Sequence, residues 1–311
     1  MGEGVKSERT SIAFLFLLVP ALMLIIGYFI YPYPHADIAV TLIPIPIFLG
    51  LIFLLAGFLY PIPKIASKIK IAGWMVFAFY WATQPSTLYL GEEGDFVNAF
   101  ICIAGVFVLS YVAYHEWLSI RRNERVKCLN WIAGAAAIAG LIYFGIERTE
   151  LAPWLIESVA IQSSLILNAV VGNVTVSGVN IFHNGSYVVT IIFACTAVQA
   201  MVLFVGLILA LPNVDGKRKI YGLLVTIIPV YFLNLLRNAL VGFLIVNNIT
   251  DFATAHNIIA KVGALLTLII LLLILIKIIP EIYDEIICVT ELHKRKGPLE
   301  QFFRNILGRK K

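Results

Sequence analysis

The sequence predicts an all-α polytopic membrane protein with about eight transmembrane helices, on three grounds. Of its 311 residues, 60% are hydrophobic and only 13% are charged. Apolar runs of about twenty residues, long enough to cross a hydrocarbon core of roughly 30 Å, recur along the chain. The 23 lysines and arginines outnumber the 18 acidic residues, for a formal net charge of +5, and they cluster between these runs. Such clustering indicates orientation in a membrane and not nucleic-acid binding.

The apolar runs between charged or Pro/Gly-rich breaks give eight predicted spans. They lie near 12–31, 42–60, 71–90, 96–118, 129–146, 189–211, 220–246 and 257–279. Five basic clusters fall in alternate gaps: Lys6 and Arg9; Lys64, Lys68 and Lys70; Arg121, Arg122, Arg125 and Lys127; Lys217, Arg218 and Lys219; and the stretch from Lys294 to Lys311. The positive-inside rule places all five clusters, and therefore both termini, in the cytoplasm.

Two further segments complete the predicted organisation. Residues 151–171 are apolar but contain five polar side chains, Glu157, Gln162, Ser163, Ser164 and Asn168. A span there would move the basic cluster at 217–219 outside, so we expect an external interfacial helix. The last residues, LEQFFRNILGRKK, indicate a basic amphipathic helix. We therefore expect membrane helices 1–4 in residues 1–128, helices 5–8 with the active site in 129–280, and a cytoplasmic tail in 281–311.

The external segment before the sixth span has the pattern of a β-hairpin. In residues 173–192, NVTVSGVNIFHNGSYVVTII, β-branched residues alternate with polar ones. Asn184-Gly185 favours a type I′ turn, which needs positive φ at both central residues. The hairpin is either a structural cap or a strand edge that aligns an extended peptide.

The four cysteines, Cys102, Cys128, Cys195 and Cys288, are scattered without a CxxC or zinc-type spacing. This predicts neither a metal site nor a disulfide framework, and no cofactor is expected. Cys195 stands out because it lies in ACTAVQAM, at the outer end of an apolar run.

Two other polar groups are expected at the membrane depth of Cys195. Arg237 lies inside an apolar run, where an arginine costs several kcal/mol and usually marks a site. At about 1.5 Å per helical residue, Arg237, Cys195 and His256 lie roughly 27, 24 and 31 Å from the inner ends of their predicted helices. All three therefore approach the outer boundary, and the helix starts at Cys195 and His256 favour a thiolate and an uncharged imidazole.

A cysteine, a histidine and an arginine at one depth suggest acyl transfer. The thiolate attacks a carbonyl, the histidine takes and returns a proton, and the guanidinium stabilises the oxyanion. Five polar residues near this level are candidates for substrate binding or for helix packing: Thr196, Gln199, Asn234, Asn238 and Asn257.

At these residues the sequence resembles the exosortase/archaeosortase family of membrane cysteine transpeptidases. The resemblance rests on ACTAVQAM around Cys195, NLLRNALVGF around Arg237 and AHNIIAKVGALL around His256. It implies that these three residues form the catalytic set, with Lys261 as the alternative third member. The implied substrate is a secreted, surface-layer-type protein whose C-terminal signal has a Pro-Gly-Phe-type motif, a transmembrane helix and a basic tail. Cleavage leaves a thioester on the enzyme, and the new C-terminus passes to an amine of a membrane lipid.

Three other functions fit parts of the pattern. An anion-binding transporter would use Arg237 and a kink at Pro229, although we find no internal repeat. An intramembrane cysteine protease would hydrolyse the same substrate without transfer. A structural scaffold would need none of the three residues. The sequence does not predict an oligomeric state.

Overall fold

The computed structural model describes residues 2–35, 41–91, 94–306 and 308, with side chains from residue 11 onward. The side chains of Lys6, Arg9, Arg309, Lys310 and Lys311, all in predicted basic clusters, lie outside the described part. Contacts divide the chain into unit 1, Met1–Ala137 with Glu285–Lys311, and unit 2, Ile138–Asp284. The predicted three-part division remains a prediction.

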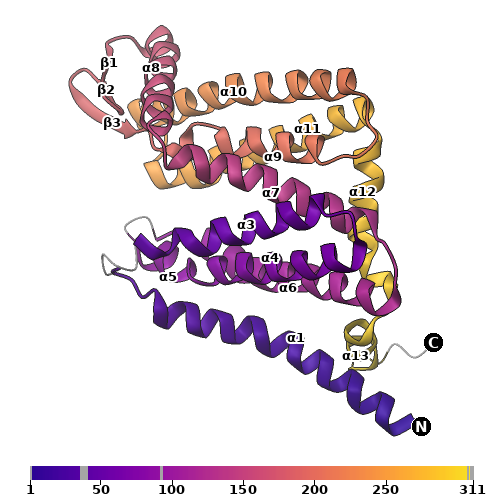
Figure 1. Cartoon of the computed structure of the whole chain (residues 1–311). Coiled ribbons are helices and arrows are strands. Elements are labelled where there is room, and N and C mark those ends of the chain that lie inside the picture. The colour runs from indigo at the N-terminus through magenta and orange to yellow at the C-terminus, as the bar shows by residue number, and fades with distance from the viewer. Residues whose placement is uncertain (1, 36–40, 92–93, 307, 309–311) are drawn as a thin grey trace. The chain divides into compact units, whose positions relative to one another are not determined.

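Unit 1 is a helical bundle to which the C-terminal segment returns. Its helices are α1 (Gly2–Ile30), α3 (Pro44–Leu59), α4 (Pro63–Ala82), α5 (Pro85–Leu90), α6 (Phe96–Arg122), the start of α7 (Lys127–Glu147), the end of α12 (Glu281–Thr290) and α13 (Pro298–Ile306). A 3-10 turn, η3 (Glu291–Arg295), joins the last two. Helix α4 packs against both α3 and α6 (Figure 1). A proline begins each of α3, α4 and α5. Backbone N–H groups in the first turn have no partner within the helix, so a proline there removes no hydrogen bond.

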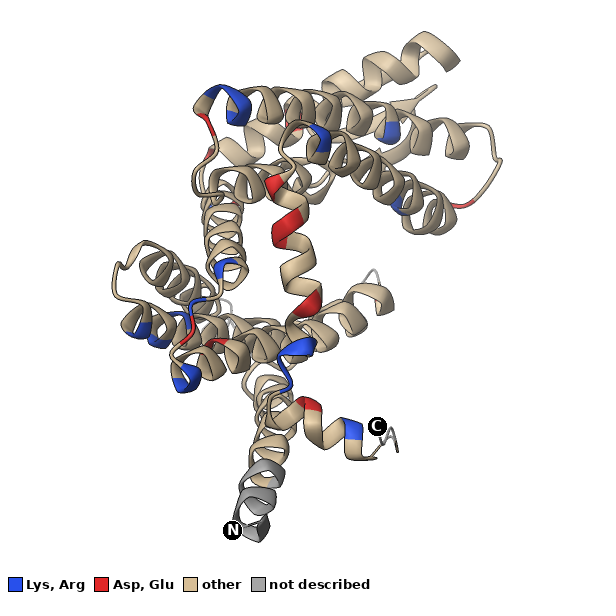
Figure 2. Ribbon diagram, turned by 90° about the vertical axis from the view of Figure 1, so that its right-hand side faces the viewer, with Lys and Arg blue, Asp and Glu red and all other residues tan. Residues whose placement is uncertain are grey.

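The apolar helices indicate a multi-pass membrane protein by length and composition, and the count of eight spans remains a prediction. Six described helical segments are long and apolar enough: Ser11–Ile30, α6, α7, α8 (Leu151–Val171), α10 (Gly216–Val246) and Thr254–Ile278. The runs at 42–60 and 189–211 contain shorter helices, α3 and α9 (Val198–Leu209). The run at 71–90 divides between α4 and α5, since Pro85 favours a helix start there. Figure 2 shows the long helices with few charged residues along their lengths.

An ion pair is buried inside unit 1. Because α4 begins at Pro63, Lys70 lies two turns into the helix and is only 4% exposed, instead of joining a solvated cluster. Its ammonium is 2.6 Å from the carboxylate of Glu116 on α6. The hydroxyl of Ser67 donates to the same carboxylate at 2.6 Å, and Lys70 donates to Asn130 at 3.3 Å. Each charge therefore has an opposite charge or a polar partner.

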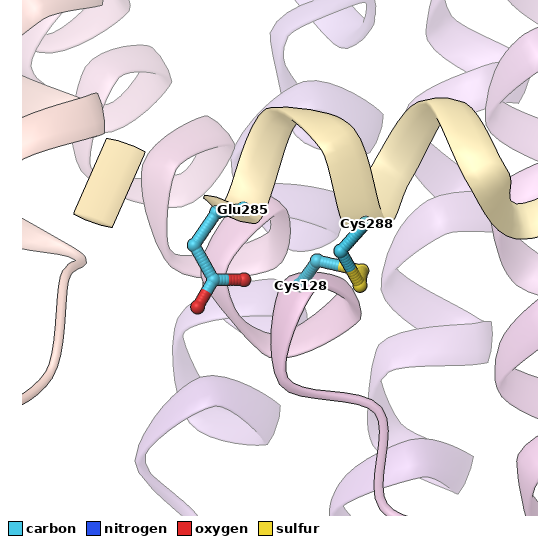
Figure 3. A group of neighbouring side chains, drawn as sticks. All are labelled: Cys128, Glu285 and Cys288. Atoms are coloured by element: carbon cyan, nitrogen blue, oxygen red, sulfur yellow. A yellow bond between two sulfur atoms is a disulfide. The ribbon is translucent and has the colours of Figure 1, made fainter. Parts of the chain in front are cut away.

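A disulfide joins Cys128 at the start of α7 to Cys288 in α12, so the expectation of no disulfide was wrong (Figure 3). The two cysteines are 160 residues apart, and only the return of the chain brings their Cα atoms to 5.9 Å. The Glu285 carboxylate lies on the same side of α12, with its oxygen and the two sulfurs within 4.8 Å of one another (Figure 3). With the sulfurs bonded to each other, neither is a thiolate ligand.

Helix α13 fixes the C-terminal segment to α1 and α6. Leu299 is buried with Ala13 and Tyr114. The hydroxyls of Tyr111 and Tyr114 donate to the Glu300 carboxylate at 2.9 and 3.1 Å. The amphipathic tail thus packs against α1 and α6 through Leu299 and Phe302.

Unit 2 contains α8, a small sheet, α9, α10, a π-helical turn η2 (Thr254–Ala260) and α11 (Lys261–Ile278). Figure 1 shows α8 lying across the axes of α9, α10 and α11, the direction expected for an interfacial helix beside spanning ones. By length and composition alone α8 also qualifies as a span.

The sheet has three antiparallel strands, where the sequence predicted two. They are β1 (Val174–Ser177), β2 (Asn180–His183) and β3 (Ser186–Thr190), in the order β1-β2-β3. The Asn184-Gly185 turn joins β2 to β3 as predicted, with φ of 51° and 78°. Gly178, with φ of 59°, supplies the additional turn between β1 and β2. Ile181, Val188 and Val189 are buried with Val159 and Leu167 of α8, so the sheet is fixed to that helix.

Candidate active site

Cys195 lies before a helix and not inside one. The predicted span at 189–211 consists of the end of β3, an extended Ile191-Ile192 link, a 3-10 turn (Phe193–Cys195) and α9. The β-branched run that ends at Ile192 favours strand over helix. Cys195 is 6% exposed and lies three residues before Val198, where α9 begins. It therefore keeps the predicted position near a helix N-terminus.

Two asparagines of α10 hold the backbone of Cys195. The side-chain amides of Asn234 and Asn238 donate to its carbonyl oxygen at 2.7 and 3.1 Å. The two residues are four apart, so they lie on one face of the helix. Here they position the thiol-bearing residue, and their predicted role in binding substrate remains a prediction.

Arg237 lies on the same helix, between these asparagines. Its Nε donates to the carbonyl oxygen of Ala260 at 3.3 Å, and its Nη1 to Oδ1 of Asn238 at 3.4 Å. The guanidinium and the Cys195 thiol are also close enough to interact electrostatically. Both described hydrogen-bond acceptors of Arg237 are neutral.

His256 lies in the π-helical turn that precedes α11. Its ring stacks on Phe252, with 5.2 Å between ring centroids, and the residue is half-buried. The same turn ends at Ala260, whose carbonyl accepts from Arg237, so a hydrogen bond links the His256 segment to α10. Single π-helical turns are frequent at functional sites. The choice between His256 and Lys261, which begins α11, remains open.

The remaining predicted residues occupy different environments. Thr196 is buried, and its hydroxyl donates to the carbonyl of Phe193 at 2.7 Å, which closes the turn around Cys195. Gln199 in the first turn of α9 and Asn257 in the π-helical turn are exposed. Only these last two present their side chains to the surroundings.

Sequence reasoning missed two residues of α8 that support this region. The hydroxyl of Tyr231 donates to Oε1 of Gln162 at 3.0 Å, and Asn238 donates to the Ser163 hydroxyl at 3.5 Å. The available signal was the presence of these polar residues in an apolar helix, which we used only as evidence against a span. Gln162 and Ser163 face α10, and Ser163 is fully buried.

Comparison with known proteins confirms the resemblance at a distance. Archaeosortase A of Haloferax volcanii is 25% identical over 199 residues, or 58% of this chain and 63% of the relative. Archaeosortase A of Natronomonas pharaonis is 26% identical over 192 residues, or 57% and 58%. The matches thus span less than two thirds of either relative. No family model and no solved structure matches the chain. The chain is a distant homologue of proteins named archaeosortase A, over somewhat more than half of its length.

Proposed function

We propose that this protein is a membrane cysteine transpeptidase that processes the C-terminal sorting signals of secreted proteins and transfers the new C-terminus to a membrane lipid. The observation that carries the proposal is the setting of Cys195. Its thiol precedes α9, two asparagines hold its carbonyl, and the Arg237 guanidinium lies within electrostatic reach. The homology to archaeosortase A supports the same function.

In the proposed reaction the Cys195 sulfur attacks the carbonyl carbon of the scissile peptide bond. His256 accepts the thiol proton and returns it to the departing amine, so the C–N bond breaks and a thioester forms. Arg237 stabilises the negative oxygen of the tetrahedral intermediate, since its two described hydrogen-bond acceptors, the Ala260 carbonyl and the Asn238 amide oxygen, are neutral. The amine of the lipid then attacks the thioester, which releases the thiol.

Strand β3 supplies a natural place for the substrate peptide. It is an edge strand of the described sheet and ends at Thr190, five residues before Cys195. An extended peptide that pairs with such an edge gains backbone hydrogen bonds in a fixed register. The substrate helix would then lie beside the bundle and present its motif at the thiol.

The test is co-expression with a C-terminally signalled substrate, followed by intact-mass measurement of the product. Cys195→Ala should leave the substrate full length, whereas Cys102→Ala, which removes the other free and buried cysteine, should process it normally. A product that carries a lipid mass supports transfer, and one with a free carboxylate indicates a protease that only hydrolyses. Processing by Cys195→Ala would refute both.

The strand assignment can be tested separately with the inactive Cys195→Ala protein. A photocrosslinking residue in place of the exposed Tyr187 on β3 should capture the substrate. The same residue in place of the exposed Tyr221, near the start of α10, is the matched control and should not. Equal capture at both positions would contradict the proposal for β3.

A further inference from the structure

A basic cavity in unit 1 lies outside the proposed active site. It is open, has a volume of about 360 Å³, and lies between the end of α6 and the turn before α13. Its described lining includes three cations, Arg121, Arg122 and Lys296, and no carboxylate. A volume of this size is in the range of small-ligand sites.

The cations are held in place by contacts within unit 1. The Arg121 guanidinium lies 5.0 Å from the ring centroid of Trp117, a cation–π distance. Arg122 donates to the carbonyls of Arg295 and Lys296 at 2.7 and 3.4 Å, which fixes the turn that carries Lys296. Lys296 has a φ of 52°, and Gln301 donates to its carbonyl at 2.8 Å. The cavity is therefore built by specific contacts and is more than a cluster of surface lysines.

The surroundings of the cavity match a lipid headgroup better than a free anion. Helix α6 is long and apolar enough to span a membrane, and it ends at Arg122, so the cavity lies at the depth of the headgroups. Trp117 is an aromatic residue of the kind enriched at that depth. Leu118 and Pro298 add apolar side chains to the lining, against which the start of an acyl chain can pack. By the positive-inside rule this is the cytoplasmic side, whose leaflet carries anionic lipids.

We propose that this cavity binds the phosphate headgroup of an anionic phospholipid through Arg121, Arg122 and Lys296. The headgroup phosphate would accept hydrogen bonds from the two guanidinium groups and lie against the Lys296 ammonium. The bound lipid would tie the end of α6 to the turn before α13. This site is independent of the proposed peptide processing.

The experiment is calorimetric titration of the full-length protein, in neutral detergent, with dioctanoyl phosphatidylglycerol. The triple variant Arg121→Gln/Arg122→Gln/Lys296→Gln should bind at least about tenfold more weakly, since each cation near a lipid surface contributes about a factor of five. The matched control, Lys64→Gln/Lys68→Gln/Lys217→Gln, loses the same charge at three exposed positions and should bind like wild type. Equal affinities of the two triple variants would overturn the proposal.

Titrations with two further ligands test whether the bound phosphate belongs to a lipid or is a free anion, and whether the net charge of the lipid matters. Dioctanoyl phosphatidylcholine, which is neutral overall, should bind at least about tenfold more weakly than phosphatidylglycerol, and so should inorganic phosphate. Equal binding of inorganic phosphate would replace the lipid by a free anion, and equal binding of phosphatidylcholine would remove the role of charge. Either result overturns the proposal.

Loss of folding in the triple variant would not end the test. The single variant Arg121→Gln, at an exposed side chain, should still weaken phosphatidylglycerol binding about fivefold. With wild-type protein, affinity should also fall as sodium chloride is raised, because salt screens the attraction. Binding that is indifferent to both changes contradicts the proposal.

Discussion

The two units differ in what surrounds a positively charged side chain inside the helices. In unit 1 the buried ammonium of Lys70 lies 2.6 Å from the carboxylate of Glu116. In unit 2 the described hydrogen bonds of Arg237 go to a backbone carbonyl and an amide oxygen, both neutral. A charge paired within the fold is used for structure, whereas a charge left against neutral acceptors can stabilise an anion that forms during a reaction.

The comparison predicts its largest effect for the ion pair of unit 1. Glu116→Gln leaves the Lys70 ammonium buried without its carboxylate, so the free energy of unfolding should fall by about 3–5 kcal/mol. Replacing both residues, as Lys70→Met/Glu116→Leu, should recover most of this loss, since no unpaired charge remains. Thermal unfolding in detergent measures both. If the double variant is as unstable as the single one, the pair is not the cause.

Arg237 should show the opposite behaviour. Arg237→Gln should slow substrate processing by about 10²–10³-fold, the usual effect of removing an oxyanion donor. Its unfolding midpoint should change little, because neither described hydrogen-bond acceptor of Arg237 is a carboxylate that would be left buried without a partner. Arg237→Lys keeps the charge without the planar fork and should be intermediate in rate. A drop in stability as large as that of Glu116→Gln would assign Arg237 a structural role.

The difference between the units also limits what the sequence could reveal. The cost of placing an arginine in an apolar run singled out Arg237, and the small residues around Cys195 singled out the thiol. Lys70 was misassigned because hydropathy cannot show that Glu116, 46 residues later, lies opposite it. The Cys128–Cys288 disulfide was missed for the same reason, since its partners are 160 residues apart.

The predicted helix boundaries were wrong where strand propensity and the length of an apolar run favoured different structures. The run 189–211 has the length of a span, yet its β-branched start extends β3, so α9 begins only at Val198. In α8, Gln162 and Ser163 were correctly recognised as unusual in an apolar run. Their partners Tyr231 and Asn238 lie on α10, and no local pattern identifies them.

A smaller effect should distinguish positioning from catalysis within unit 2. Asn234→Leu/Asn238→Leu removes both donors to the Cys195 carbonyl, so kcat should fall by about tenfold or more with little change in KM. Asn247→Leu is the matched control, because the Asn247 amide donates to Phe243 of its own helix. Steady-state processing kinetics with a purified substrate measure the difference. An equal loss in the control would point to a general effect on α10.

The smallest effect concerns the acidic group that holds α13 in unit 1. Burial raises the pKa of Glu300, but hydrogen bonds from His115, its own backbone and Tyr111 outweigh it and hold the pKa below its usual value. A carboxyl with a depressed folded pKa adds stability above its unfolded pKa, near 4.3, and this contribution is lost as pH falls through the folded pKa. The unfolding midpoint of wild type should therefore exceed that of Glu300→Gln at pH 7, and the difference should shrink below about pH 4.3. Glu291→Gln, which removes an exposed partner of Lys294, should show a much smaller difference. A difference between wild type and Glu300→Gln that stays constant down to pH 3 would mean that the ionised carboxylate does not hold α13 in place.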